Sequence, residues 1–246
     1  MTAPRVAGAI ASLTILLFAC GGPPLQATKP ARENRYPAVF VSGSFEPYGI
    51  GMSPIYRDRA RSDSVATAMA LRGLSWARHV RVRGEKLFQV RGVGDLHFRG
   101  QDVELLDAAP VRAQSTRLDT CVLDDRVWVV AQGPGPLCAQ TQMFPETKPA
   151  WFEELPKKNG WTFAHGVSTL SYKDEAGSWE VATYRALVEL AVDRSARLGS
   201  LERSTTGAVE GAMRVQVDAE LVGARIVGRW RDQRNVHVLA ASQVAR

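Results

Sequence analysis

The chain has 246 residues, with 31 lysines and arginines against 25 aspartates and glutamates and a formal net charge of +6. Because 45% of the residues are apolar and 8% are aromatic, the composition supports packed cores and excludes a largely disordered protein. The charges are scattered, without a block of about five or six cations, so we expect no nucleic-acid partner and at most weak contact with anionic material such as peptidoglycan.

The N-terminus predicts an export signal. Arg5 precedes an apolar run of 13 residues, Val6 to Phe18, which is shorter than the roughly 20 residues that a membrane-spanning helix needs. A basic residue, a short apolar segment and small residues at the cleavage site together make a secretory signal peptide. One interpretation is an ordinary signal of this kind that has a cysteine near its cleavage site.

The end of this run, Leu17-Phe18-Ala19-Cys20, resembles the lipobox of bacterial lipoproteins. The resemblance implies that residues 1–19 are removed and that Cys20 becomes the lipidated first residue. Insertion of acyl chains into the bilayer contributes about 0.8 kcal/mol of binding free energy per buried methylene, so this anchor would hold the protein at the membrane. Gly21 stands where an Asp would retain a lipoprotein at the inner membrane. The implied location is the periplasmic face of the cell outer membrane.

Two Pro-rich stretches divide the rest of the chain. Residues 20–37 contain four prolines and little apolar periodicity, which predicts a flexible tether behind the lipid. Residues 141–160 are also rich in proline and are expected to form a linker. The sequence therefore predicts two folded units, residues 38–140 and residues 161–246.

The two units are similar when the chain is shifted by 116 residues. Eleven of the 23 positions from 56 to 78 are then identical to their counterparts. Small apolar residues recur every fourth position in both units, which predicts a long helix packed closely on a sheet. These residues are Ala66, Ala70 and Leu74 in the first unit and Ala182, Ala186 and Leu190 in the second. Helical composition alone is the alternative explanation.

Strands are expected on both sides of each helix. Ala38–Val41 and Trp161–Ala164 are predicted to be short strands, each followed by a turn containing glycine, Gly49-Ile50-Gly51 in the first unit and Gly166 in the second. Ser62 or Ser178 could begin the helix as an N-cap.

Each unit is predicted to end in a hairpin. The first hairpin spans Thr116 to Ala131 around Asp124-Asp125, and the second spans Ala224 to Ala240 around Asp232 to Asn235. Glu85–Val93 could add a strand to the first unit, whereas Thr206–Val217 is ambiguous. The expected fold class is α+β, with two related units that each pack a long helix on a small antiparallel sheet.

Several stretches of the second unit resemble a known family. They are Pro149–Trp151, Phe163–Ser168, Ala176–Arg197, Ile226–Trp230 and Val236–Ala240. Together they resemble a small family of bacterial outer-membrane lipoproteins that includes a surface lipoprotein antigen, flagellar basal-disk lipoproteins and the N-terminal region of a flagellar H-ring protein. A fainter resemblance covers Ala38–Ala131, so the chain would contain two tandem copies. The resemblance implies a helix packed on a small antiparallel sheet.

Cys121 and Cys138 are the two cysteines outside the signal region. A pair of cysteines in an exported protein is expected to be oxidised to a disulfide. Their spacing is not CxxC, so the bond is expected to be structural. In the hairpin of the first unit, Cys121 occupies the place that Trp230 has in the second.

No catalytic, cofactor or metal site is predicted. His79, His97, His165 and His237 lie apart in the sequence without metal-binding spacing, and we expect each to be a surface or structural residue. The chain lacks GxSxG, and Gly92–His97 is expected to be a turn.

The predicted function is a non-catalytic structural or assembly role in the cell envelope, through self-association or contact with envelope proteins. The alternative is a module that binds peptidoglycan or regulates an envelope enzyme.

Overall fold

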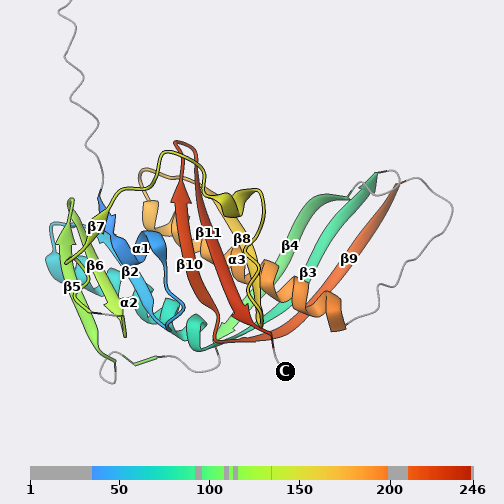
Figure 1. Cartoon of the computed structure of the whole chain (residues 1–246), viewed down its shortest axis with the longest axis horizontal. Helices are drawn as coiled ribbons and strands as arrows, with labels where there is room; N and C mark the ends of the chain where they lie inside the picture. Colours follow the sequence, from blue (N-terminus) through green and yellow to red (C-terminus); the bar gives the residue numbers. More distant parts are fainter. Residues whose placement is uncertain are drawn as a thin grey trace, which may run out of the picture. The chain divides into compact units, whose positions relative to one another are not determined.

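The computed structural model describes residues 35–91, 96–107, 111–112, 116–133, 135–198 and 210–244. Cys20 and the rest of the signal region lie outside these residues. All of the described residues belong to one compact unit. They form helices and small antiparallel sheets, in agreement with an α+β class (Figure 1).

The first sheet has strand order β2-β6-β5 and carries helix α2 on one face. Its elements are β2 (Gly49–Pro54), α2 (Arg59–Arg78), β5 (Leu118–Leu123) and β6 (Arg126–Ala131). The core between helix and sheet consists of fully buried residues, namely Ala66, Ala70, Leu74, Val127, Val129 and Ala131. The four-residue spacing therefore predicted the packed face of α2 correctly.

The second sheet has strand order β10-β11-β8 and carries helix α3. Its elements are β8 (Trp161–Thr169), α3 (Glu175–Leu198), β10 (Arg225–Arg231) and β11 (Asn235–Gln243). Ala182, Ala186 and Leu190 are buried in the same core as Val236, Val238 and Ala240. The second helix also packs with the face that its sequence pattern predicts.

Glycines in the first strand of each sheet allow the helix to approach closely. A Cβ atom on Gly51 would collide with the carbonyl oxygen of Ala66, and one on Gly166 with that of Ala182. A glycine inside a strand commonly marks such an approach of another backbone. The prediction of turns at Gly49–Gly51 and Gly166 was therefore wrong, because these residues lie inside β2 and β8.

The third sheet joins the two halves of the chain. It has strand order β4-β3-β9, with β3 (His79–Arg91) directly after α2, then β4 (Leu96–Asp107), and β9 (Glu210–Val222) from the C-terminal half (Figure 1). β3 pairs with β9 along 13 residues, from His79 opposite Val222 to Arg91 opposite Glu210. The ambiguous stretch Thr206–Val217 thus contributes a strand from Glu210 onward.

A short helix lies where a strand was expected. Ala38–Val41 belongs to α1 (Ala38–Ser42), where Phe40 and Val41 are buried. Before it, Tyr36 and Pro37 form β1, which pairs with β7 (Thr141–Gln142). Tyr36 is 1% exposed because its ring packs against aromatic side chains, so the folded part begins within the predicted tether.

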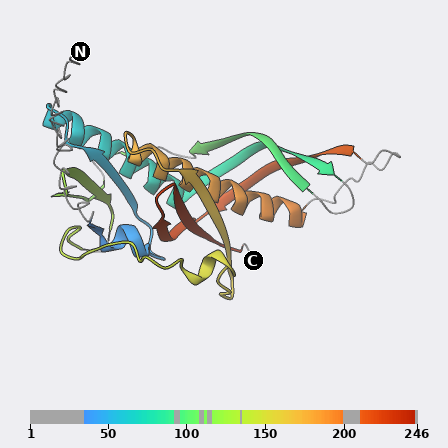
Figure 2. The ribbon, with the colours of Figure 1, turned by 90° about the horizontal axis from the view of Figure 1, so that it is seen from above.

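The predicted linker also contains a short helix, η2 (Ala150–Phe152). Helices α2 and α3 lie beside each other (Figure 2), and Arg72 of α2 forms an ion pair with Glu180 of α3. No helix among the described residues is both long and apolar enough to cross a membrane.

Candidate functional site

The first sheet buries its second face in an aromatic core. Phe40 of α1 lies 4.9 Å from Trp128 of β6 and 5.2 Å from Trp179 of α3, measured between ring centroids, and both contacts are edge-on. Tyr36 stacks on Phe40, and Phe144 stacks on Trp179. This face is therefore covered by side chains from the N-terminal segment, the linker and α3.

A buried carboxylate lies at the edge of this core. The side chain of Glu175, at the start of α3, is 10% exposed and accepts hydrogen bonds from Arg126 at 2.6 Å, Arg231 at 3.2 Å and the Tyr36 hydroxyl at 2.8 Å. Burial, and then the negative charge of Glu175, raise the pKa of Tyr36. Because its partners come from β1, β6 and β10, Glu175 joins parts of both sheets.

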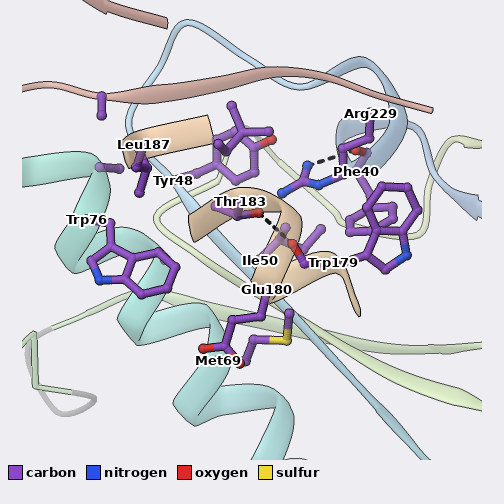
Figure 3. A pocket seen from close by; sticks show the side chains of 14 residues that line it. Phe40, Tyr48, Ile50, Met69, Trp76, Trp179, Glu180, Thr183, Leu187 and Arg229 are labelled. Carbon is purple, nitrogen blue, oxygen red and sulfur yellow. Dashed lines mark hydrogen bonds between the residues drawn. The ribbon is translucent and has the colours of Figure 1, made fainter. Parts of the chain in front are cut away.

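A cavity of about 50 Å³ lies beside the same core (Figure 3). Residues from α1, β2, α2, α3 and β10 line it, and aromatic and aliphatic side chains dominate its wall. The lining includes Phe40, Tyr48, Trp76, Trp179, Thr183 and Arg229. This composition, with a few polar groups in an apolar wall, is typical of small-molecule sites.

Arg229 of β10 is the cation of this cavity. It is 7% exposed, and Figure 3 shows its guanidinium pointing from β10 toward the middle of the cavity. Its Nη1 donates to the carbonyl oxygen of Phe40 at 2.9 Å, and its guanidinium carbon lies 4.4 Å from the centre of the Phe40 ring. Its Nε is buried without a hydrogen-bond partner among the described residues.

Two histidines meet on the outer face of the second sheet. His165 Nε2 and His237 Nδ1 are 3.0 Å apart, and the two rings are stacked with centroids 5.2 Å apart. Phe152 of η2 packs on both histidine rings, and Trp151 and Trp230 pack at the sides. The linker thus covers this face with aromatic side chains.

The surroundings keep this pair neutral near pH 7. Burial lowers the pKa of His165. Burial and, secondly, the neighbouring His165 lower the pKa of His237 to about 4, although Asp232 acts in the opposite direction. One ring can donate its N–H to the facing nitrogen of the other, and protonation of both rings would place a hydrogen on each facing nitrogen and break this bond.

The sequence does not reveal this pair, because its four histidines lie far apart and have no metal-binding spacing. His165 and His237 are 72 positions apart, and pairing of β8 with β11 brings them together, with Val167 opposite His237 and Leu239 opposite His165. The predicted strand Trp161–Ala164 ends before His165, whereas the observed strand continues to Thr169 and places both histidines on one face. His79 lies instead beside Glu220, 3.5 Å away.

The predicted cysteine pair does come together. The structure joins Cys121 and Cys138 in a disulfide with a Cα–Cα distance of 6.1 Å. Cys121 lies on β5 opposite Trp128, at the edge of the aromatic core. Cys20, the predicted lipidation site, lies outside the described residues.

The described residues contain no group of three or more His, Cys, Asp or Glu side chains that could hold a metal ion.

No protein-family model, curated protein or solved structure matches this chain. Of the groups described above, Arg229 is a buried cation beside a cavity, Glu175 connects elements of both sheets, and His165 and His237 form a hydrogen-bonded pair.

Proposed function

We propose that this chain is an outer-membrane lipoprotein, anchored by lipid on Cys20, with a non-catalytic structural or assembly role in the cell envelope. The lipobox-like Leu17–Cys20 segment supports the anchor. The Cys121–Cys138 disulfide supports export, because such bonds persist in oxidising compartments.

We also propose that the two sheets with their helices are copies of one unit. Their strand orders agree. In each sheet, the strand that comes first in the chain pairs with the strand that comes last, β2 with β6 and β8 with β11. The strand between them in sequence, β5 or β10, lies at an edge of the sheet. The register supports this further. Between the first and last strands, Gly51 lies opposite Val129 in the first sheet and Gly166 lies opposite Val238 in the second. Within the hairpins, Cys121 lies opposite Trp128 and Trp230 lies opposite His237.

The hydrogen bonds at the helix starts give independent support. Asp58 accepts from the Ala60 N–H at 3.0 Å, and Asp174 accepts from the Gly177 N–H at 2.9 Å. The hydroxyls of Ser62 and Ser178 accept from the backbone N–H of the segment before the helix, at 2.8 and 2.9 Å. These serines therefore fix the entry of the chain, whereas the N-cap of α2 is Asp58.

The β4-β3-β9 sheet is the observation that carries the assembly role. Within the described part of the chain, β4 and β9 each pair with β3 alone, along strands of 12 and 13 residues. Long edge strands present unpaired N–H and C=O groups that can pair with another chain. Addition of strands to an exposed sheet edge is a common mode of protein association.

Light scattering of the protein purified in detergent tests this role. We expect its mass to rise with concentration, beyond that of one chain in one micelle. Hydrogen exchange in the associated state should show slower exchange in β4 or β9, whereas the shorter edge strands β5 and β10 serve as internal controls. A mass equal to one chain at every concentration, with unchanged exchange in both strands, would remove self-assembly.

Two further measurements address location and the alternative partner. Cys20→Ser should release a folded protein into the periplasm, and a variant that stays with the membrane would contradict the lipid anchor. Co-sedimentation with purified peptidoglycan tests the alternative role as a wall-binding module. Binding that salt weakens would favour that role, in keeping with the net positive charge of the chain.

A further inference from the structure

We propose that the Arg229 cavity binds a small carboxylate with a short apolar group. The carboxylate would accept hydrogen bonds from the guanidinium of Arg229, and the apolar group would lie against the aromatic wall formed by residues such as Trp76 and Trp179 (Figure 3). This ligand site is additional to the proposed assembly role and does not depend on it.

The charge balance of the cavity favours an anion. Arg229 is buried, and its guanidinium brings a positive charge to the cavity. No acidic side chain among the described residues forms an ion pair with it. Its hydrogen-bond and cation–π partner is Phe40, through the carbonyl oxygen and the ring, and its Nε is buried without a hydrogen-bond partner among the described residues. A buried charge without a counter-charge is unfavourable, so an added anion would stabilise the folded protein.

Glu180 is the acidic residue in the lining, and it does not neutralise Arg229. It forms an ion pair with Arg72 of α2. The hydroxyl of Thr183 is also occupied, since it donates to the Trp179 carbonyl oxygen at 2.8 Å. Among the lining residues described, Arg229 is therefore the charged group that retains a donor without a hydrogen-bond partner.

The size and wall of the cavity define the ligand class. A volume of about 50 Å³ accommodates roughly four water-sized groups at about 10–15 Å³ each. A planar guanidinium matches the geometry of a carboxylate, which it can bind through two parallel hydrogen bonds. Such a group could belong to a free short-chain acid or to the C-terminal alanine of a peptide.

Thermal unfolding and tryptophan fluorescence of the intact lipoprotein in detergent test the site, because Trp76 and Trp179 line the cavity. The probes are sodium propionate and N-acetyl-alanyl-alanine, with propionamide and the peptide amide as neutral counterparts and sodium chloride at equal ionic strength. We expect one or both acids to raise the melting temperature in a saturable manner, and the neutral probes to have no effect. A response to propionate alone would identify a free acid, and tighter binding of the peptide would identify a chain terminus.

Substitutions distinguish binding at Arg229 from a general salt effect. Arg229→Lys should weaken binding at least tenfold, because it loses the planar fork, and Arg229→Met should abolish it. Arg225→Met is the matched control: Arg225 lies on the same strand and donates to the carbonyl oxygens of Phe45 and Ala77, but it does not line the cavity. Near-ultraviolet circular dichroism would verify folding, and Arg229→Lys still tests the site if Arg229→Met does not fold. Absence of saturable binding to the wild-type protein, or equal binding by folded Arg229 variants, would overturn the proposal.

Discussion

The buried carboxylate of Glu175 allows a quantitative test of how the two sheets are held together. We predict that Glu175→Gln lowers the free energy of unfolding by about 3 kcal/mol. The substitution keeps the shape of the side chain but leaves Arg126 and Arg231 without the charge that they both contact. Removing one partner of a buried ion pair costs about 3–5 kcal/mol. We expect the low end, because the two arginine side chains remain 19% and 21% exposed.

Urea denaturation followed by tryptophan fluorescence, under oxidising conditions, measures this loss. Glu180→Gln is the matched control on the same helix, because Glu180 is 30% exposed and pairs with Arg72, which is 50% exposed. An exposed ion pair contributes about 0–1 kcal/mol, so the control should change stability little. Equal losses in the two variants would refute the idea that Glu175 joins the sheets.

Three further predictions concern the disulfide, a glycine contact and pH. Reducing the Cys121–Cys138 bond, with a sequence separation of 17, should lower the free energy of unfolding in urea by about 3 kcal/mol. Gly166→Val should cost about 3 kcal/mol in the same assay because its Cβ would meet the backbone of α3, whereas Gly73→Ala, with 3.4 Å to its nearest contact, should be neutral or stabilising. The pKa of His237 is about 4, below its ordinary 6.5, so the unfolded chain binds the proton first. Stability should therefore be full above pH 6.5 and fall toward pH 4, and His237→Phe should remove that part of the pH dependence of unfolding.

The features that the sequence predicts well depend on local periodicity. The Ala66-Ala70-Leu74 face is visible in the sequence because residues four apart share one face of a helix. The second hairpin is also local, since β10 and β11 are joined by a short turn at Asp232–Asn235. The sequence predicts the elements and faces, whereas the β3–β9 pairing depends on contacts between residues more than 100 positions apart.

The two local errors show tertiary packing outweighing propensity. Ala38–Val41 contains β-branched and aromatic residues and predicts a strand, yet it forms α1 because Phe40 and Val41 are buried there among aromatic side chains. Gly49 and Gly51 suggest a turn, yet they pair with β6 as part of β2, and glycine is needed there because a Cβ at either position would meet the backbone of α2. In both cases the deciding contact lies outside the local sequence window.

The residues of the candidate sites were missed for a related reason. Arg229 lies in a strand that was correctly predicted, but its chemistry depends on Phe40, which is 189 positions away in the sequence. A single arginine among 31 cations carries no local mark of burial. Only the packing of α1 against β10 shows that this cation faces a cavity.

The outer faces of the two sheets explain why their equivalent positions differ in chemistry. In the proposed alignment, Trp128 corresponds to His237. Each lies opposite a residue on the preceding strand of its hairpin, Trp128 opposite Cys121 and His237 opposite Trp230. Trp128 is fully buried under α1 and packs in a large aromatic core, where an apolar ring gains from complete burial. The face that carries His237 is covered instead by the aromatic residues of η2, a helix of three residues. Because this short helix covers little of the face, His165 remains half-buried. Two polar rings are tolerated there because they form a hydrogen bond with each other. If the units are copies, the cover that each sheet acquired therefore accounts for the loss of symmetry between them.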